Sequence, residues 1–181
     1  MRHEVMDYIR IPLERIGVLI GTKGQVKSDL ERFTDTKITV DSKEGLVTIK
    51  TVEHEDPLKA WKARDIVRAI GRGFSPKNAF KLLNDEVYLE IMDLNSYLGH
   101  SKKTKKRIKG RIIGFGGKAR RIVEDLTKTK VSVYGDTVAI IGNLEDLLKA
   151  KEAIEMLIKG SQHSTIYRML SSHRSSKKPI P

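Results

Sequence analysis

The chain contains no cysteine, and its five histidines are scattered along 181 residues. Without thiols, neither a disulfide framework nor a cysteine-based zinc site can form. The histidines do not recur at the short spacings of metal ligands; they are His3, His54, His100, His163 and His173. We therefore expect no metal site and no cofactor.

Long apolar runs are also missing. No stretch approaches the roughly 20 apolar residues that span a bilayer, and the opening MRHEVMDYIR lacks the apolar core of a signal peptide. Apolar residues still make up 39% of the chain, which is enough to build packed cores. These features predict a globular, cytoplasmic protein.

Acidic side chains are outnumbered, 23 against 35 basic ones, for a net charge of +12. This excess favours a polyanionic partner, because Lys and Arg release counterions from phosphates. Residues 1–73 carry 14 basic and 12 acidic side chains, residues 74–160 carry 17 and 11, and residues 161–181 carry four basic and none acidic. A polyanion should therefore prefer the C-terminal half.

The sequence contains an internal repeat. Residues 16–24, IGVLIGTKG, align with residues 109–117, KGRIIGFGG. The match continues past the glycines, because TDTKITV at 34–40 aligns with TKTKVSV at 127–133. A match of this length is not expected by chance, so the sequence predicts two copies of one domain.

Each copy predicts the order strand, helix, helix, strand, strand, helix. Two residues, Gly135 and Asp136, separate the last two strands of the second copy, as in a tight hairpin. The expected fold is α+β, with two domains that each pack a three-stranded antiparallel sheet on three helices. The expected boundaries are 1–73 for the first domain, 74–86 for a short helical linker, 87–160 for the second domain and 161–181 for a basic, partly disordered tail.

A G-x-x-G sequence occurs between the first two expected helices of each copy. Glycines at a helix start let phosphates approach backbone N–H groups at the positive end of the helix dipole. One such loop is a weak signal, but two inside a repeat are a strong one. The two loops are Gly21-Thr22-Lys23-Gly24 and Gly114-Phe115-Gly116-Gly117.

With these loops, residues 5–73 and 87–159 resemble KH domains of type I, which clamp about four nucleotides of single-stranded RNA beside an apolar groove. The resemblance implies that Ile112, Ile113, Val131 and Val133 floor the groove of the second domain. Phe115 either stacks on a base or packs on its own helix. The RNA-binding residues we expect there are Arg107, Lys109, Arg111, Ile112, Ile113, Gly114, Phe115, Gly116, Gly117, Lys118, Arg120, Arg121, Val131 and Val133.

The charged residues near the two loops indicate which loop is better suited to bind RNA. Basic residues surround the second loop without an intervening acid, whereas Glu14, Asp29 and Glu31 lie close to the first. The second domain is therefore the expected RNA clamp. The first is a second RNA site or a protein site, with the residues Gly21, Thr22, Lys23, Gly24 and Lys27. Trp61, on its last helix, is expected in the core.

A narrower resemblance rests on AIGRGFS at 69–75 and KRIKGRIIG at 106–114. Together they are similar to the partner-of-Nob-one family of small-subunit ribosome assembly factors, whose archaeal members are little more than two KH domains. The resemblance implies binding near the 3′ end of small-subunit (16S) ribosomal RNA and cooperation with the endonuclease that matures that end. It leaves a translation or ribosomal factor as a possible protein partner of the first domain, whose G-x-x-G is intact here but degraded in eukaryotic relatives.

Three alternatives compete with RNA binding by KH domains. An enzyme with a P-loop does not fit, because Ile112 stands where the first glycine is needed and Ala119 where Ser or Thr would bind magnesium. A protein adaptor would bind RNA weakly and without preference. A stable ribosomal or exosome subunit would co-purify with those particles.

Overall fold

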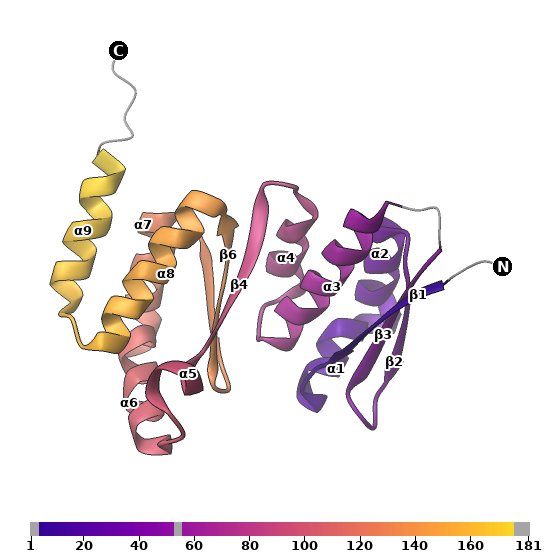
Figure 1. The fold of residues 1–181 in the computed structure, drawn as a ribbon, viewed down its shortest axis with the longest axis horizontal. Helices are drawn as coiled ribbons and strands as arrows, with labels where there is room; N and C mark the ends of the chain where they lie inside the picture. Colours follow the sequence, from indigo (N-terminus) through magenta and orange to yellow (C-terminus); the bar gives the residue numbers. More distant parts are fainter. Residues whose placement is uncertain (1–3, 53–55, 176–181) are drawn as a thin grey trace, which may run out of the picture. The chain divides into compact units, whose positions relative to one another are not determined.

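The computed structural model describes residues 4–52 and 56–175 (Figure 1). The chain divides into two compact units, Met1–Asp85 and Glu86–Pro181. Within the described residues, no helix is both long and apolar enough to cross a membrane.

The first unit is an antiparallel sheet in the order β1-β3-β2 with helices packed against it. Its strands and helices follow the expected order, with two short additions at the end. The elements are β1 (Glu4–Arg10), α1 (Leu13–Ile20), η1 (Thr22–Gly24), α2 (Gln25–Thr34), β2 (Lys37–Asp41), β3 (Leu46–Val52), α3 (Pro57–Gly71), α4 (Pro76–Ala79) and η2 (Phe80–Leu83).

The second unit repeats this plan with the sheet order β4-β6-β5, which confirms the α+β class and the repeat. Tyr134 pairs with Thr137 across the predicted two-residue turn, where Gly135 has a φ of 54°. The elements are β4 (Val87–Asp93), α5 (Leu94–Leu98), α6 (Lys102–Ile113), η3 (Phe115–Gly117), α7 (Lys118–Thr127), β5 (Lys130–Tyr134), β6 (Thr137–Asn143), α8 (Leu144–Lys159) and α9 (His163–Ser175).

The repeated T-x-T sequence builds the same junction in both units. In the second, the hydroxyls of Thr127 and Thr129 lie 2.8 Å apart in the core, and Thr127 Oγ1 donates to Val123 O. Glu124 Oε1 accepts a hydrogen bond from Val131 N at 2.7 Å. In the first unit the matching bonds are Thr34–Thr36, Thr34–Leu30 and Ile38–Glu31. Each G-x-x-G helix is thereby fixed to the strand that follows it.

Helix α9 was not expected, because residues 161–181 read as a basic tail. Ile166 and Leu170 are buried in the core of the second unit, and Met169 packs against it. Figure 1 shows α9 lying against α7 and α8. The sequence signal is weak because this apolar stripe is only one turn long and polar residues surround it. Residues 176–181 lie outside the described residues.

Residues 74–86 were expected as a short helical linker, and they are helical from Pro76 to Leu83. They form α4 and η2, which pack on α3 of the first unit. Ala79 and Leu82 are buried, and the Phe80 ring contacts Phe33 edge-on, with 6.1 Å between centroids. The segment therefore packs as part of the first unit.

Candidate nucleic-acid interface

The two G-x-x-G loops have the same backbone. Gly21 and Gly114 have φ and ψ of 74°, 175° and 73°, 173°, a region open essentially to glycine alone. A Cβ on Gly114 would also lie 2.7 Å from Ala119 N, and one on Gly21 would lie 2.4 Å from the Val26 side chain. The first glycine of each loop is therefore required by conformation and by space.

The third loop position is left-handed in both units, at φ 52° in Lys23 and 56° in Gly116. The last glycines, Gly24 and Gly117, are left-handed as well. Because the backbones agree, any difference in what the two loops bind comes from side chains.

Both loops end at uncapped helix starts. Gly117 precedes α7 without a side-chain cap, and the first turn of α7 holds no acidic residue. The first N–H groups of a helix have no partner inside it and carry partial positive charge. A phosphate oxygen is a suitable acceptor at this position.

The Phe115 side chain is 98% exposed at the tip of the second loop. It does not pack on its own helix, so the structure favours the other alternative, in which the ring can stack on a base. Its counterpart in the first loop is Thr22, which has no ring.

Some basic side chains near the second loop are exposed beside it, whereas others are half-buried or bonded within the fold. Lys118 and Arg107 are exposed, and Arg121 Nη2 donates to Gly116 O at 2.8 Å, so its guanidinium lies over the loop. Arg120 is half-buried, and its buried Nε has no hydrogen-bond partner among the described residues. Lys109 Nζ donates instead to Gly135 O at 2.9 Å.

Arg111 has a different position from the one expected for an RNA contact. Its Nη2 donates to Ser161 O at 2.5 Å, and its own carbonyl is 2.9 Å from His163 Nε2. Arg15 acts similarly in the first unit, where it donates to Ile70 O and Phe74 O at 2.7 Å. Arg15 thus binds the end of α3 and the chain after it, and Arg111 binds the chain after α8.

Only part of the expected apolar floor reaches the surface. Ile112 and Val131 are buried in the core of the second unit, whereas Ile113 is 36% exposed and Val133 is half-buried. The accessible apolar surface is therefore Ile113 and Val133.

The first loop has fewer available cations. Lys23 and Thr22 are exposed, but Lys27 Nζ pairs with Glu31 at 3.2 Å. Trp61 is 61% exposed, so its expected place in the core is wrong. Helix α3 presents its other face, with Ala63, Ile66 and Val67, to the core.

Sequence reasoning missed the role of the lysines before the second loop. Helix α6 begins at Lys102, and Ser101 caps it by accepting from Thr104 N at 3.3 Å. This cap signal was present in the sequence. The Lys105 side chain is only 7% exposed and binds Asn95 and Asp136 at 2.7 and 2.6 Å.

Family models match both units. Residues 88–175 match the eukaryotic type KH domain (KH domain type I), and residues 15–85 match the Krr1 KH1 domain. The KH domain-containing protein MJ0443 of Methanocaldococcus jannaschii is 49% identical over 96% of this chain and 76% of that protein. The RNA-binding protein PNO1 of Oryzias latipes is 34% identical over 90% of this chain and 68% of its own length.

Solved structures agree over almost the whole chain. Dim2p from Pyrococcus horikoshii has a TM-score of 0.87 and 51% identity, covering 93% of this chain and 99% of that one. A complex of a/eIF2alpha, aDim2p and rRNA from the same organism contains a chain with a TM-score of 0.89 and 50% identity, covering 96% of both chains. The chain therefore belongs to the pno1 (partner-of-Nob-one) family of RNA-binding proteins with two KH domains.

Proposed function

We propose that the chain binds single-stranded ribosomal RNA and that the loop Gly114–Gly117 is the clamp. The observation that carries this is the exposed Phe115 ring on a loop whose flanking sequence, residues 101–123, holds no acidic side chain. The loop supplies N–H groups for phosphates and a ring for a base. Arg107, Lys118 and Arg121 add positive charge around it.

The proposed target is the 3′ end region of small-subunit ribosomal RNA, bound during ribosome biogenesis in the cytoplasm. Two observations support this target: family membership, and the presence of rRNA in the complex of the Pyrococcus horikoshii relative. The chain would act by binding alone and leave RNA cleavage to the endonuclease that matures this end.

A paired-loop experiment tests the clamp. A fluorescent single-stranded 3′-end fragment is titrated with the wild type, with Phe115→Asp/Gly116→Asp, and with the matched variant Thr22→Asp/Lys23→Asp. Stacking on an aromatic ring contributes about 1–3 kcal/mol per base, so the first variant should bind at least about 5-fold more weakly. Equal affinity of the first variant and the wild type would exclude the clamp.

A competition experiment separates this function from a protein adaptor. Duplex RNA of equal length should compete poorly, because its bases are stacked and paired and cannot enter a KH groove. Equal competition by duplex and single strand would favour the adaptor.

The first unit carries a feature that favours a protein partner. Leu58 and Trp61 are exposed on α3, and Leu58, Phe33 and Leu83 line a cavity of about 280 Å³. We propose that a translation factor docks there, since the relative's complex also contains a/eIF2alpha. Trp61→Ser should weaken binding of that factor in calorimetry without changing RNA affinity. An unchanged affinity for the factor would exclude this surface.

A further inference from the structure

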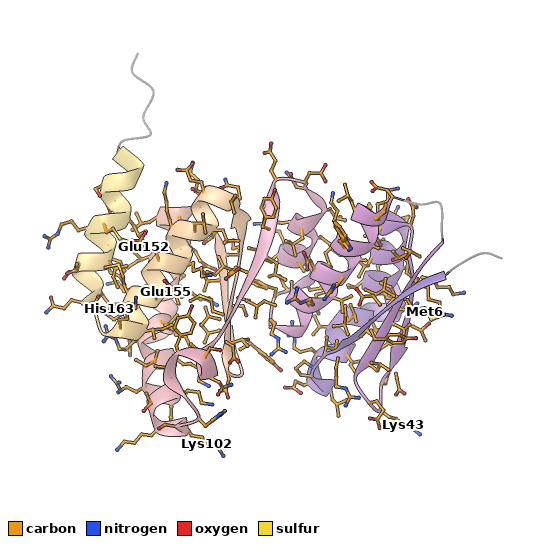
Figure 2. All side chains as sticks on the ribbon, in the orientation of Figure 1. Met6, Lys43, Lys102, Glu152, Glu155 and His163 are labelled. Carbon is orange, nitrogen blue, oxygen red and sulfur yellow. The ribbon has the colours of Figure 1, made fainter. Side chains whose placement is uncertain are left out.

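A second basic site lies at the other end of α6 from the G-x-x-G loop. Four lysines and His100 line a cavity of about 610 Å³ between the start of α6 and the β5–β6 turn. The lysines are Lys102, Lys105, Lys106 and Lys109, and Figure 2 labels Lys102 at the start of this helix.

The cavity has more positive charge than its own residues neutralise. Its one acidic lining residue, Asp136, contacts both Lys105 at 2.6 Å and Lys109 at 3.7 Å. The side chains of Lys102 and Lys106 are exposed, and neither ammonium forms an ion pair or a hydrogen bond with a residue that the structure describes. Two cations and His100 therefore remain available to a ligand.

The start of α6 is unfavourable without such a ligand. Four of its first five residues are lysines, and its first turn has no acidic residue. Cations near the positive end of a helix are unfavourable, and Lys102 and Lys106 also repel each other as an i, i+4 pair. A bound anion would relieve both effects. Local conflicts of this kind are expected at functional sites.

The helix connects this cavity to the clamp loop. Lys102, Lys106, Lys109 and Ile113 recur at i, i+4, i+7 and i+11, which places them along one face of α6. At about 1.5 Å per residue, the helix of 12 residues is about 18 Å long. One face thus runs from the cavity to the exposed Ile113 beside Gly114.

We propose that the cavity is a second phosphate site, and that single-stranded RNA held in the loop Gly114–Gly117 continues along α6 into it. The ligand is the phosphodiester backbone beyond the roughly four nucleotides that a KH domain clamps. This inference rests on the proposed function and extends it, because it makes affinity depend on RNA length.

The test compares a four-nucleotide RNA with one of about ten nucleotides that contains it. The variant is Lys102→Gln/Lys106→Gln in the full chain, and the matched control is Lys159→Gln/Arg168→Gln, which removes the same charge at exposed positions of α8 and α9. The variant should lose at least about 10-fold affinity for the long RNA and keep its affinity for the short one. For the long RNA, the slope of log affinity against log salt concentration should become shallower by about 1.4, because each of the two lost phosphate contacts accounts for about 0.7.

Other outcomes would contradict either the second phosphate site or the clamp. Equal effects of variant and control on the long RNA, or equal losses for both RNAs, would exclude the second site. If Lys102→Gln/Lys106→Gln weakens the binding of inorganic phosphate in calorimetry but leaves the affinity for the long RNA unchanged, the cavity binds a free anion instead, and the proposal is wrong. If Phe115→Asp/Gly116→Asp leaves short-RNA affinity unchanged, the clamp itself fails.

Discussion

Lys105 and Asp136 form an ion pair at 2.6 Å that joins α6 to the turn between β5 and β6. The Lys105 side chain is buried, and its ammonium also donates a hydrogen bond to Asn95 Oδ1 at 2.7 Å. The lysine run before the clamp loop therefore contains one residue that holds the fold among others that face solvent.

The pair predicts a pH dependence of stability. The hydrogen bond from Lys105 is the largest cause that lowers the pKa of Asp136. A carboxyl whose pKa is lowered by folding stabilises the native state above its unfolded pKa, near 3.9, and loses this contribution as pH falls. Asp136→Asn should therefore unfold at a lower temperature than the wild type at pH 7, with the difference shrinking below about pH 4. A temperature difference that stays constant from pH 7 to pH 3 would contradict this.

Arg111 is predicted to stabilise the fold more than it binds RNA. Its guanidinium donates to Ser161 O, next to the start of α9. A hydrogen bond from a charged group contributes about 1.5–3 kcal/mol, so Arg111→Gln should lower the free energy of unfolding in urea by about that amount. The control is Arg107→Gln, at an exposed position of the same helix. That variant should lose RNA affinity while its stability changes by less than about 0.5 kcal/mol.

The repeat made most of the fold predictable from sequence. The T-x-T and G-x-x-G positions are repeated because each copy needs the same buried hydroxyl pair and the same glycine backbone. Such requirements act within a few residues, so a sequence pattern shows them. The class, the order of strands and helices along each copy and the position of both loops followed from these patterns.

Long-range contacts were less predictable. Ile112 and Val131 were assigned to the groove by analogy, but which face of α6 meets the sheet depends on packing that spacing does not fix. Trp61 was expected in the core, yet it lies on the exposed face of α3. Arg111 binds a carbonyl 50 residues away in the chain, and no local pattern indicates that partner.

Helix α9 is predicted to belong to the folding unit of the second domain. Ile166 is fully buried among residues of α7 and α8. Truncating a buried Ile to Ala costs about 2–5 kcal/mol, since it removes buried methyl groups and leaves a cavity. Ile166→Ala should lower the free energy of unfolding in urea by an amount in this range. The matched control is Thr165→Ala, at an exposed position of the same helix, which should change the free energy of unfolding by less than about 0.5 kcal/mol. Similar small effects of both would mean that α9 docks weakly.

The first and third residues of the clamp loop, Gly114 and Gly116, should tolerate substitution very differently. At Gly114 an alanine would meet a glycine-only backbone and a Cβ contact of 2.7 Å with Ala119 N, at a cost above about 1–3 kcal/mol. At Gly116 a Cβ meets nothing within 4 Å, and a left-handed residue costs only about 1–2 kcal/mol.

Lys23 already occupies the position equivalent to Gly116 in the first loop, at φ 52°, so a side chain there is compatible with the loop. Gly116→Lys should therefore fold, lose about 1–2 kcal/mol in urea unfolding, and bind single-stranded RNA at least as tightly as the wild type because it adds a cation beside Phe115. Gly114→Ala should lose more stability and most of its RNA affinity, because shifting Ala119 moves the start of α7. If Gly114→Ala were as stable as Gly116→Lys and bound RNA equally well, the N–H groups at the start of α7 would not form the phosphate site.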